Sequence, residues 1–160
     1  MKKIVLVGNP NVGKSVVFTQ LTGVYAVSSN YPGTTVDFLR GTLKKDHETW
    51  ELIDAPGTYA LSSEIEAERI TGQLIDEADI VVNVVDAGNL ERNLYLTFEL
   101  RERRKPTVVA LNMWDEAKKR GIHIDIGKLS AILGVPVVPV VATSGEGIKE
   151  LFEALDRATP

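Results

Sequence analysis

The residue pattern with the clearest chemistry is an eight-residue loop near the start of the chain, Gly8-Asn9-Pro10-Asn11-Val12-Gly13-Lys14-Ser15. Its spacing is Gly-x-x-x-x-Gly-Lys-Ser, in which backbone N–H groups surround a nucleotide diphosphate and the glycines allow close approach and positive φ. Lys14 supplies a charge to the terminal phosphates, Ser15 offers its hydroxyl to Mg²⁺, and Val16 continues the binding segment. Because the apolar run 4–7 precedes it and a helix-like segment follows, we expect a phosphate-binding loop rather than an ordinary glycine turn.

A second candidate site is the sequence Asp54-Ala55-Pro56-Gly57, which begins 40 residues after Lys14. Asp54 can hold Mg²⁺ through water, and the Gly57 N–H can meet a γ-phosphate, which is how such a loop senses the third phosphate. A plain Asp-x-Pro-Gly turn would explain the tetrapeptide alone. Its place after the first loop favours the phosphate-sensing interpretation.

A third box, Asn112-Met113-Trp114-Asp115, closes the apolar run 108–111. The Asp115 carboxylate can accept two hydrogen bonds from the ring N–H and the exocyclic amine of guanine, groups that adenine arranges differently. Met113 stands where a lysine is usual, and its flexible thioether can cover one face of the base. Alternatively, Asn112 and Asp115 only cap a helix. With the two phosphate boxes before it, the third box favours GTP and GDP; an ATP-using kinase is a minor alternative, which competition by GDP but not ADP would eliminate.

Composition limits the classes of protein to consider. The 160 residues are 44% hydrophobic and 25% charged, which suits one globular domain over residues 1–160. The net charge of −4 provides no basic surface for a nucleic acid. The absence of cysteine excludes disulfides, iron–sulfur clusters and thiol catalysis, and it is compatible with a reducing cytoplasm. No apolar stretch approaches the ~20 residues of a membrane-spanning helix.

Apolar β-branched runs alternate with helical periods along the chain. This alternation predicts a doubly wound α/β sheet whose ligands bind at the carboxyl ends of the strands. The expected fold is that of a P-loop NTPase, of the G-domain type, with six mainly parallel strands and about five helices. Strands are expected at 2–8, 36–43, 48–54, 79–85, 107–112 and 136–140, the second and third as an antiparallel hairpin. Helices are expected at 14–22, 62–75, 90–104, about 125–133 and 147–157, with a loop at 23–35.

The three boxes in this order resemble those of translation-factor-type GTPases, and longer segments narrow the resemblance to the FeoB family of ferrous-iron transporters. These segments are Asn30-Tyr31-Pro32-Gly33-Thr34-Thr35-Val36, the second box extended to Tyr59, residues 86–94 with their Leu-Glu-Arg-Asn-Leu run, and the Asn-Met-x-Asp box. The resemblance covers nearly all of the chain and corresponds to the amino-terminal G domain. It implies GTP hydrolysis at the cytoplasmic face of the cell membrane, in a larger membrane protein where a helical spacer and a transmembrane permease follow. A homo-oligomer is compatible with it.

The resemblance also implies roles for single residues. Thr35 would be the switch threonine that binds Mg²⁺ and the γ-phosphate in the GTP state, the alternative being that it simply begins a strand. The last base-binding box falls on residues 141–147, where Val141 replaces the usual serine. The Ala142 N–H can contact the guanine keto oxygen, since a backbone donor needs no particular side chain, and Thr143 follows it. Val141 lacks a hydroxyl that would stiffen this loop, which bears on nucleotide affinity.

Hydrolysis needs a group that stabilises charge in the transition state. Thr58 occupies the position of the water-orienting glutamine of Ras-type enzymes but is too short to replace it, and no arginine finger is evident, so we expect slow turnover. In the potassium-activated GTPases, which the FeoB family resembles, an asparagine at the position of Asn11 helps to hold a monovalent cation. We therefore expect Asn11 and the loop 31–33 to hold K⁺, the alternative being that Asn11 only braces its loop. Residues 24–37 and 54–66 would be the two switches.

A different function for the same chemistry is a regulatory GTPase that associates with the ribosome or tRNA. The sequence pI of 5.3 and the lack of a nucleic-acid-binding domain speak against it. The resemblance therefore favours control of ferrous-iron uptake, with Asn11, Lys14, Thr35 and Gly57 as the groups expected to act in hydrolysis.

Overall fold

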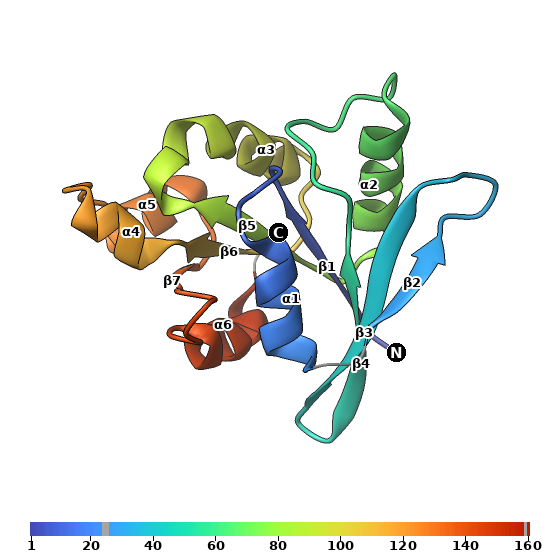
Figure 1. The fold of residues 1–160 in the computed structure, drawn as a ribbon, viewed down its shortest axis with the longest axis horizontal. Helices are drawn as coiled ribbons and strands as arrows, with labels where there is room; N and C mark the ends of the chain where they lie inside the picture. The colour runs from blue at the N-terminus through green and yellow to red at the C-terminus, as the bar shows by residue number, and fades with distance from the viewer. Residues whose placement is uncertain (24–25, 159) are drawn as a thin grey trace.

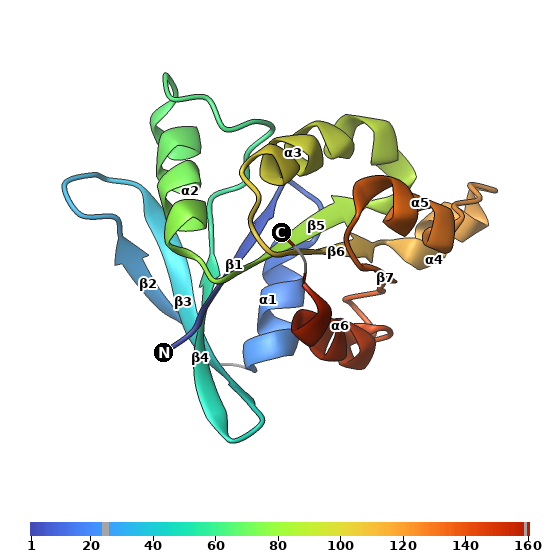
Figure 2. The ribbon, with the colours of Figure 1, turned by 180° about the vertical axis from the view of Figure 1, so that it is seen from behind.

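The structure, a computed structural model, describes residues 1–23, 26–158 and 160. Over these residues, one sheet of seven strands runs in the order β2-β3-β4-β1-β5-β6-β7, with helices on both of its faces (Figures 1 and 2). The strands are β1 (Lys3–Gly8), β2 (Val27–Asn30), β3 (Asp37–Lys45), β4 (Glu48–Asp54), β5 (Ile80–Asp86), β6 (Thr107–Asn112) and β7 (Val137–Pro139). The helices are α1 (Lys14–Thr22), α2 (Glu66–Glu77), α3 (Leu90–Glu102), α4 (Trp114–Lys119), α5 (Ile126–Leu133) and α6 (Ile148–Ala154), with 3₁₀ turns η1 (Ala87–Asn89) and η2 (Leu155–Arg157).

The sheet is parallel from β4 through β1, β5 and β6 to β7, whereas β3 pairs antiparallel with both β2 and β4. Its central strands are nearly continuous runs of buried valine, isoleucine and leucine, as expected for strands covered on both faces. On one face, Phe18 of α1 and Leu151 of α6 belong to the same buried cluster. On the other, Ile70 of α2 and Leu96 of α3 share a second cluster. The expected doubly wound α/β fold is confirmed.

The structure corrects the number and limits of several elements. Strand β2 lies within the predicted loop 23–35; it is exposed, and pairing with β3 rather than apolar patterning defines it. Residues 24–25 of that predicted loop lie outside the described residues. Helix α4 was not predicted because its six residues are too few to show a helical period. Helix α2 begins at Glu66 instead of residue 62. Ser62 belongs to the loop before the helix, and its N–H donates to the carboxylate of Glu68 in the first turn (2.9 Å).

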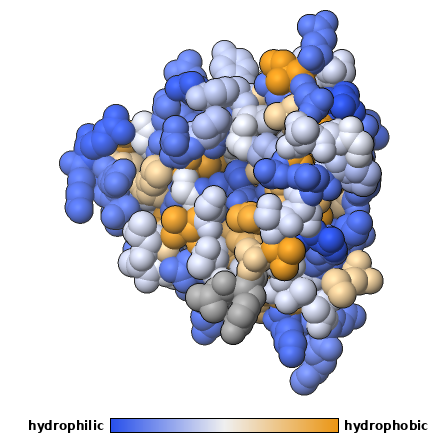
Figure 3. Space-filling model, turned by 45° about the vertical axis from the view of Figure 1, so that its right-hand side comes forward, coloured by the Kyte–Doolittle hydropathy of each residue, from blue (hydrophilic) through white to orange (hydrophobic). Residues whose placement is uncertain are grey.

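Parallel strands bring their carboxyl ends to one edge of the sheet, and every predicted box follows such an end. Gly8, Asp54 and Asn112 end β1, β4 and β6, and the register pairs Leu6 with Asp54. The face of the molecule seen in Figure 3 is largely hydrophilic and carries separate apolar patches. Within the described ranges, none of the helices combines the length and apolarity needed to cross a membrane.

Candidate functional site

The predicted phosphate loop joins β1 directly to α1, as its sequence indicates. Gly13 precedes the helix in the left-handed region (φ 82°), and a Cβ there would collide with the Asn112 side chain. A Cβ on Gly8 would lie 2.6 Å from the Val84 carbonyl oxygen, so both glycines are required by close backbone approach. The loop borders a cavity of about 410 Å³. The cavity is lined by Asn9, Pro10, Asn11, Gly13, Lys14, Ser15, Val16 and Gly57.

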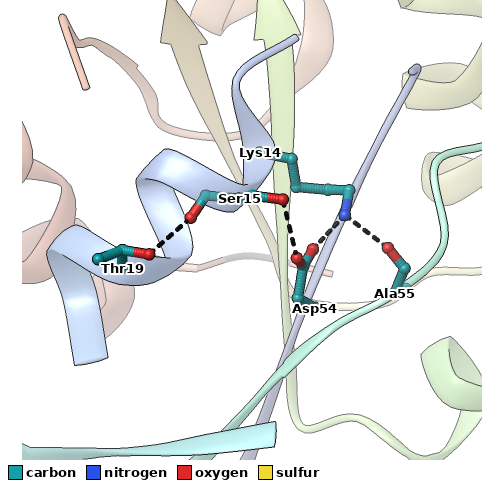
Figure 4. A network of polar contacts seen from close by, with 5 residues as sticks. All are labelled: Lys14, Ser15, Thr19, Asp54 and Ala55. Atoms are coloured by element: carbon teal, nitrogen blue, oxygen red, sulfur yellow. Dashed lines mark hydrogen bonds and ion pairs between the residues drawn. The ribbon is translucent and has the colours of Figure 1, made fainter. Parts of the chain in front are cut away.

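A polar network connects this loop to the second predicted box (Figure 4). The Lys14 ammonium pairs with Asp54 Oδ1 and donates to the Ala55 carbonyl oxygen (2.5 Å), and the Ser15 hydroxyl lies 3.4 Å from Asp54 Oδ2. Only 10% of the Lys14 side chain and 6% of that of Asp54 are exposed. The register of β4 beside β1 thus places the three predicted phosphate and metal groups within contact of one another.

The second box packs against the phosphate loop through its backbone. The Thr58 N–H donates to the Gly8 carbonyl oxygen (3.0 Å), and a Cβ on Gly57 would lie 3.2 Å from Pro10 Cα. A further cavity of about 220 Å³ lies beside the first and shares Lys14 and Gly57 with it. Gly57, within the second switch, therefore lies directly against the phosphate loop.

Helix α3 holds the next part of the second switch. The Leu61 N–H donates to Glu99 Oε2 (3.1 Å), and the Arg92 guanidinium lies 4.4 Å from the centre of the Tyr59 ring. Arg92 belongs to the Leu-Glu-Arg-Asn-Leu run that was recognised in the sequence only as a family signature. The structure gives this arginine a physical contact with the segment 54–66.

The first switch does not lie where its predicted role requires. Thr35 is exposed and lines neither of the two cavities formed by the described residues around Lys14. The turn between β2 and β3 lies instead at the outer edge of the sheet beside α2 (Figures 1 and 2). There the Tyr31 hydroxyl is 3.2 Å from Glu77 Oε1, and the ring packs against the core cluster under α2. Thr35 does not meet Ser15 and Asp54 in this arrangement, and its role in the GTP state stays a prediction.

The contact with α2 changes the pKa of the Tyr31 hydroxyl. Partial burial of the ring raises the pKa of the hydroxyl above 10.0, and the hydrogen bond to Glu77 and the charge of Glu77 raise it further, against a smaller opposing effect of Arg69. The loop 31–33 does not line the cavity that Asn11 lines, and its part in a K⁺ site stays a prediction.

Asn11 lies in the phosphate loop and lines the phosphate cavity, and its role as a cation ligand stays a prediction. It is exposed, adopts the left-handed backbone conformation (φ 67°), and lines the cavity. Its side chain forms no hydrogen bond with any residue the structure describes. The alternative that Asn11 serves to brace the loop therefore has no contact to support it.

The base box has an organising residue that is almost fully buried. Asn112 Nδ2 donates to the Val12 carbonyl oxygen (2.9 Å), and Asn112 Oδ1 accepts from the Ala142 N–H (3.0 Å). One carboxamide thus joins the phosphate loop to the last predicted box. The Ala142 N–H, expected to meet the guanine keto oxygen, already donates to Asn112 here. Its contact with a base stays a prediction.

The two other residues of the base box flank this bridge. Met113 has φ 59° and precedes α4, so its left-handed conformation turns the chain from β6 into the helix. Asp115, in the first turn of α4, is half-buried. Its carboxylate has no hydrogen-bond partner within the described part of the chain and is available to a ligand. Trp114 packs against the cluster under α4 and α5.

The last loop contains a functional residue that the sequence reasoning missed. Val141 and Ala142 are buried, whereas Thr143 is exposed. The Ser144 hydroxyl donates to the Val141 carbonyl oxygen (3.2 Å) and accepts from the Glu146 N–H (3.3 Å). Ser144 therefore supplies, three residues later, a hydroxyl that Val141 lacks. Its spacing, a serine before Gly145, is a side-chain turn signal that could have revealed it.

Gln20 was also missed. It lies on α1, and its Nε2 donates to the Ala142 carbonyl oxygen (2.8 Å) across 122 positions of the chain. No local pattern marks a single glutamine on a helix as a partner for a distant loop. With Asn112, it fixes the backbone of Ala142 from both sides.

Comparisons with known proteins agree with this geometry. The profile of the family "Ferrous iron transport protein B" matches residues 2–155. The Fe(2+) transporter FeoB of Escherichia coli K12 is 46% identical over 165 aligned positions, which cover 98% of this chain and 21% of the transporter. The chain spans about a fifth of the length of the curated relatives it matches.

Solved structures show the same fold. The cytosolic domain of Legionella pneumophila (L. pneumophila) FeoB superposes with a TM-score of 0.92 at 41% identity, over 99% of this chain and 70% of that one. The cytosolic domain of the T. maritima FeoB iron transporter in its GMPPNP form superposes with a TM-score of 0.93 at 40% identity. The match covers 98% of this chain and 63% of that one. From the phosphate loop, the family-specific run and these likenesses together, the chain belongs to the ferrous iron transport protein B (FeoB) family.

Proposed function

We propose that residues 1–160 form a single G domain that binds GTP and GDP, hydrolyses GTP slowly, and regulates ferrous-iron uptake by a larger transporter. The observation that carries the proposal is the contact of Lys14, Ser15 and Asp54 at the phosphate loop. Structures of the cytosolic domain of T. maritima FeoB are described as GMPPNP and GDP forms. This description of a relative supports a guanine nucleotide as the ligand of this chain.

Lys14 and the backbone of the phosphate loop bind the β- and γ-phosphates in this proposal. To reach them, the Lys14 ammonium exchanges the Asp54 carboxylate for phosphate oxygens, so that its charge remains compensated. Ser15 and Asp54 offer hard oxygen atoms 3.4 Å apart, which fits Mg²⁺ held partly by water and phosphate. When bound, Mg²⁺ supplies charge stabilisation at the phosphate oxygens. Thr35 joins this site only if the first switch leaves α2, and the Gly57 N–H then faces the γ-phosphate.

Asn11 supports the proposal that hydrolysis depends on K⁺. Its exposed side-chain oxygen lies at the cavity mouth without a partner in the described residues, so it is available as a cation ligand. A monovalent cation there supplies positive charge where the chain has no arginine finger. The loop 31–33 completes the cation site only after it moves from α2, which couples K⁺ binding to closure of the first switch.

The base site selects guanine through Asp115, whose carboxylate accepts from the ring N–H and exocyclic amine. Met113 covers one face of the base, and the loop 141–143 closes the other end of the site. Asn112 positions that loop rather than reading the base, since both ends of its carboxamide are already bonded.

The setting of the domain follows from the curated relatives, of which the chain spans about a fifth. We propose that a helical spacer and a transmembrane permease belong to the full-length protein, that the domain lies at the cytoplasmic face of the membrane, and that it can self-associate. Nucleic acid is not proposed as a partner, because the chain has a net charge of −4.

The test is to measure binding and turnover with GTP and ATP, each in K⁺ and in Na⁺. Binding of GTP and GDP but not ATP or ADP, with faster hydrolysis in K⁺, is expected. Asp115→Ala should abolish guanine preference, and Asn11→Ala should remove the K⁺ stimulation while leaving GDP binding in place. Equal affinity for ATP and GTP would overturn the base assignment, and equal rates in K⁺ and Na⁺ would overturn the role of Asn11.

A further inference from the structure

Asn9, in the phosphate loop, is an unusual residue for its surroundings. It is only 4% exposed, and both its Oδ1 and its Nδ2 are buried without a hydrogen-bond partner among residues 1–23, 26–158 and 160. A carboxamide can donate two hydrogen bonds and accept two, and burying one without partners is costly. Asn9 is not needed for the backbone conformation of the loop, since Gly8 and Gly13 provide the close approaches.

Thr58, in the second switch, also has a buried polar group without a partner among the described residues. It is 3% exposed, and its hydroxyl is buried without a partner in the described part of the chain. Its backbone N–H donates to the carbonyl oxygen of Gly8, the residue immediately before Asn9 (3.0 Å). This bond makes Asn9 and Thr58 neighbours where the phosphate loop meets the second switch.

We propose that Asn9 and Thr58 form a latch, in which the Asn9 carboxamide and the Thr58 hydroxyl bond to each other when a nucleoside triphosphate is bound. Asn9 is thus a positioning residue that acts through the second switch. In the arrangement described here, both groups are buried and unbonded, which destabilises this arrangement relative to one in which they pair. A ligand that binds only the paired arrangement therefore gains affinity from the free-energy difference between the two arrangements.

The γ-phosphate provides the movement that the latch requires. In the proposed function, on which this inference rests, the Gly57 N–H turns toward that phosphate. Thr58 is the next residue and moves with it, whereas Asn9 stays with the phosphate loop. GDP lacks the γ-phosphate, so it leaves the latch open.

The latch predicts opposite effects on stability and on nucleotide preference. Asn9→Leu and Thr58→Val each remove the buried polar atoms while keeping a similar shape. Each variant should be at least as stable as the wild type without nucleotide. Each should lower the ratio of GMPPNP affinity to GDP affinity about tenfold, which corresponds to about 1.4 kcal/mol. In the double variant the loss should equal that of one single variant, because both break the same contact.

The experiment is a titration of each variant with fluorescent GMPPNP and GDP, together with urea unfolding of the nucleotide-free protein. Gln73→Met on α2 is the matched control, since Gln73 Oε1 is also buried without a partner in the described residues but belongs to no switch. The control should leave the ratio of the two affinities unchanged.

The outcomes separate the latch from the proposed function. If wild-type protein binds neither nucleotide, the proposed function fails, and the latch with it. If wild-type protein binds both and the variants weaken GMPPNP and GDP equally, or neither, the latch is refuted while the function stands. Loss of stability in both single variants with an unchanged affinity ratio would also refute the latch, because it is the result expected of a purely structural role.

Discussion

The hydrogen bond between Tyr31 and Glu77 holds the first switch on α2, and Tyr31→Phe removes it while keeping the ring in the core. The bond is 3.2 Å long and lies near the surface. Its loss should therefore destabilise this position of the switch by only about 0.5–1 kcal/mol. Since Thr35 must leave this position to reach the phosphate site, the variant should bind a GTP analogue more tightly, by about two- to fivefold.

The assay is titration with fluorescent GMPPNP and GDP at constant Mg²⁺ and K⁺. GMPPNP affinity should rise and GDP affinity should stay nearly constant, because in the proposed function only the triphosphate engages Thr35. Glu77→Ala removes the acceptor of the same bond and should act in the same direction. Combining it with Tyr31→Phe should give little further gain.

A matched control is available on the same helix. Asp76 precedes Glu77 and pairs with Arg103 of the loop after α3 (2.8 Å), and its side chain has no hydrogen bond or ion pair with residues 26–37. Asp76→Asn should leave both affinities unchanged. Unchanged or weaker GMPPNP binding in Tyr31→Phe, with normal stability, would refute the reasoning that this contact competes with nucleotide binding.

Three further predictions concern the base loops and pH. Asn112→Ala should lower the free energy of unfolding by about 2–4 kcal/mol, because it leaves two buried backbone groups without partners; an unchanged urea midpoint would contradict the bridge. Ser144→Ala should weaken GDP binding by about two- to fivefold through a looser loop 141–146, and isothermal calorimetry that finds equal affinities would show that Val141 needs no compensation. The pKa of Tyr31 is raised above 10.0, so its contribution to stability is fully present below that pH and is lost as pH rises through the raised value. Phenolate absorbance should show one tyrosine ionising late, and this late step should be absent in Tyr31→Phe.

The fold was largely predictable because its signals are local or repetitive. Apolar runs such as those of β1 and β5 identify buried parallel strands wherever they occur, and the positive φ of Gly134 ends α5 as that glycine predicts. The exposed strand β2 was missed because it depends on main-chain pairing with β3, which leaves no hydrophobic pattern. Helix α4 was missed because six residues are too few to show a period.

The phosphate site followed the sequence more closely than the switches did. Lys14, Ser15 and Asp54 meet because parallel strands β1 and β4 bring their ends together, a consequence of the predicted fold. The position of Thr35 could not be predicted, since it depends on contacts of the segment around it with α2, which is distant in the chain. These contacts are the hydrogen bond between Tyr31 and Glu77 and the packing of the Tyr31 ring against the cluster under α2.

The sequence by itself determined the phosphate loop, the doubly wound α/β class with most of its strands and helices, and the family. These features depend on residue types at short spacings, which fix backbone conformation and burial through near neighbours. Only the tertiary structure decided which side chains meet. Asn112 reaches the Val12 carbonyl oxygen across 100 positions, and Asn9 becomes buried beside Thr58, because strands distant in the chain are adjacent in the sheet.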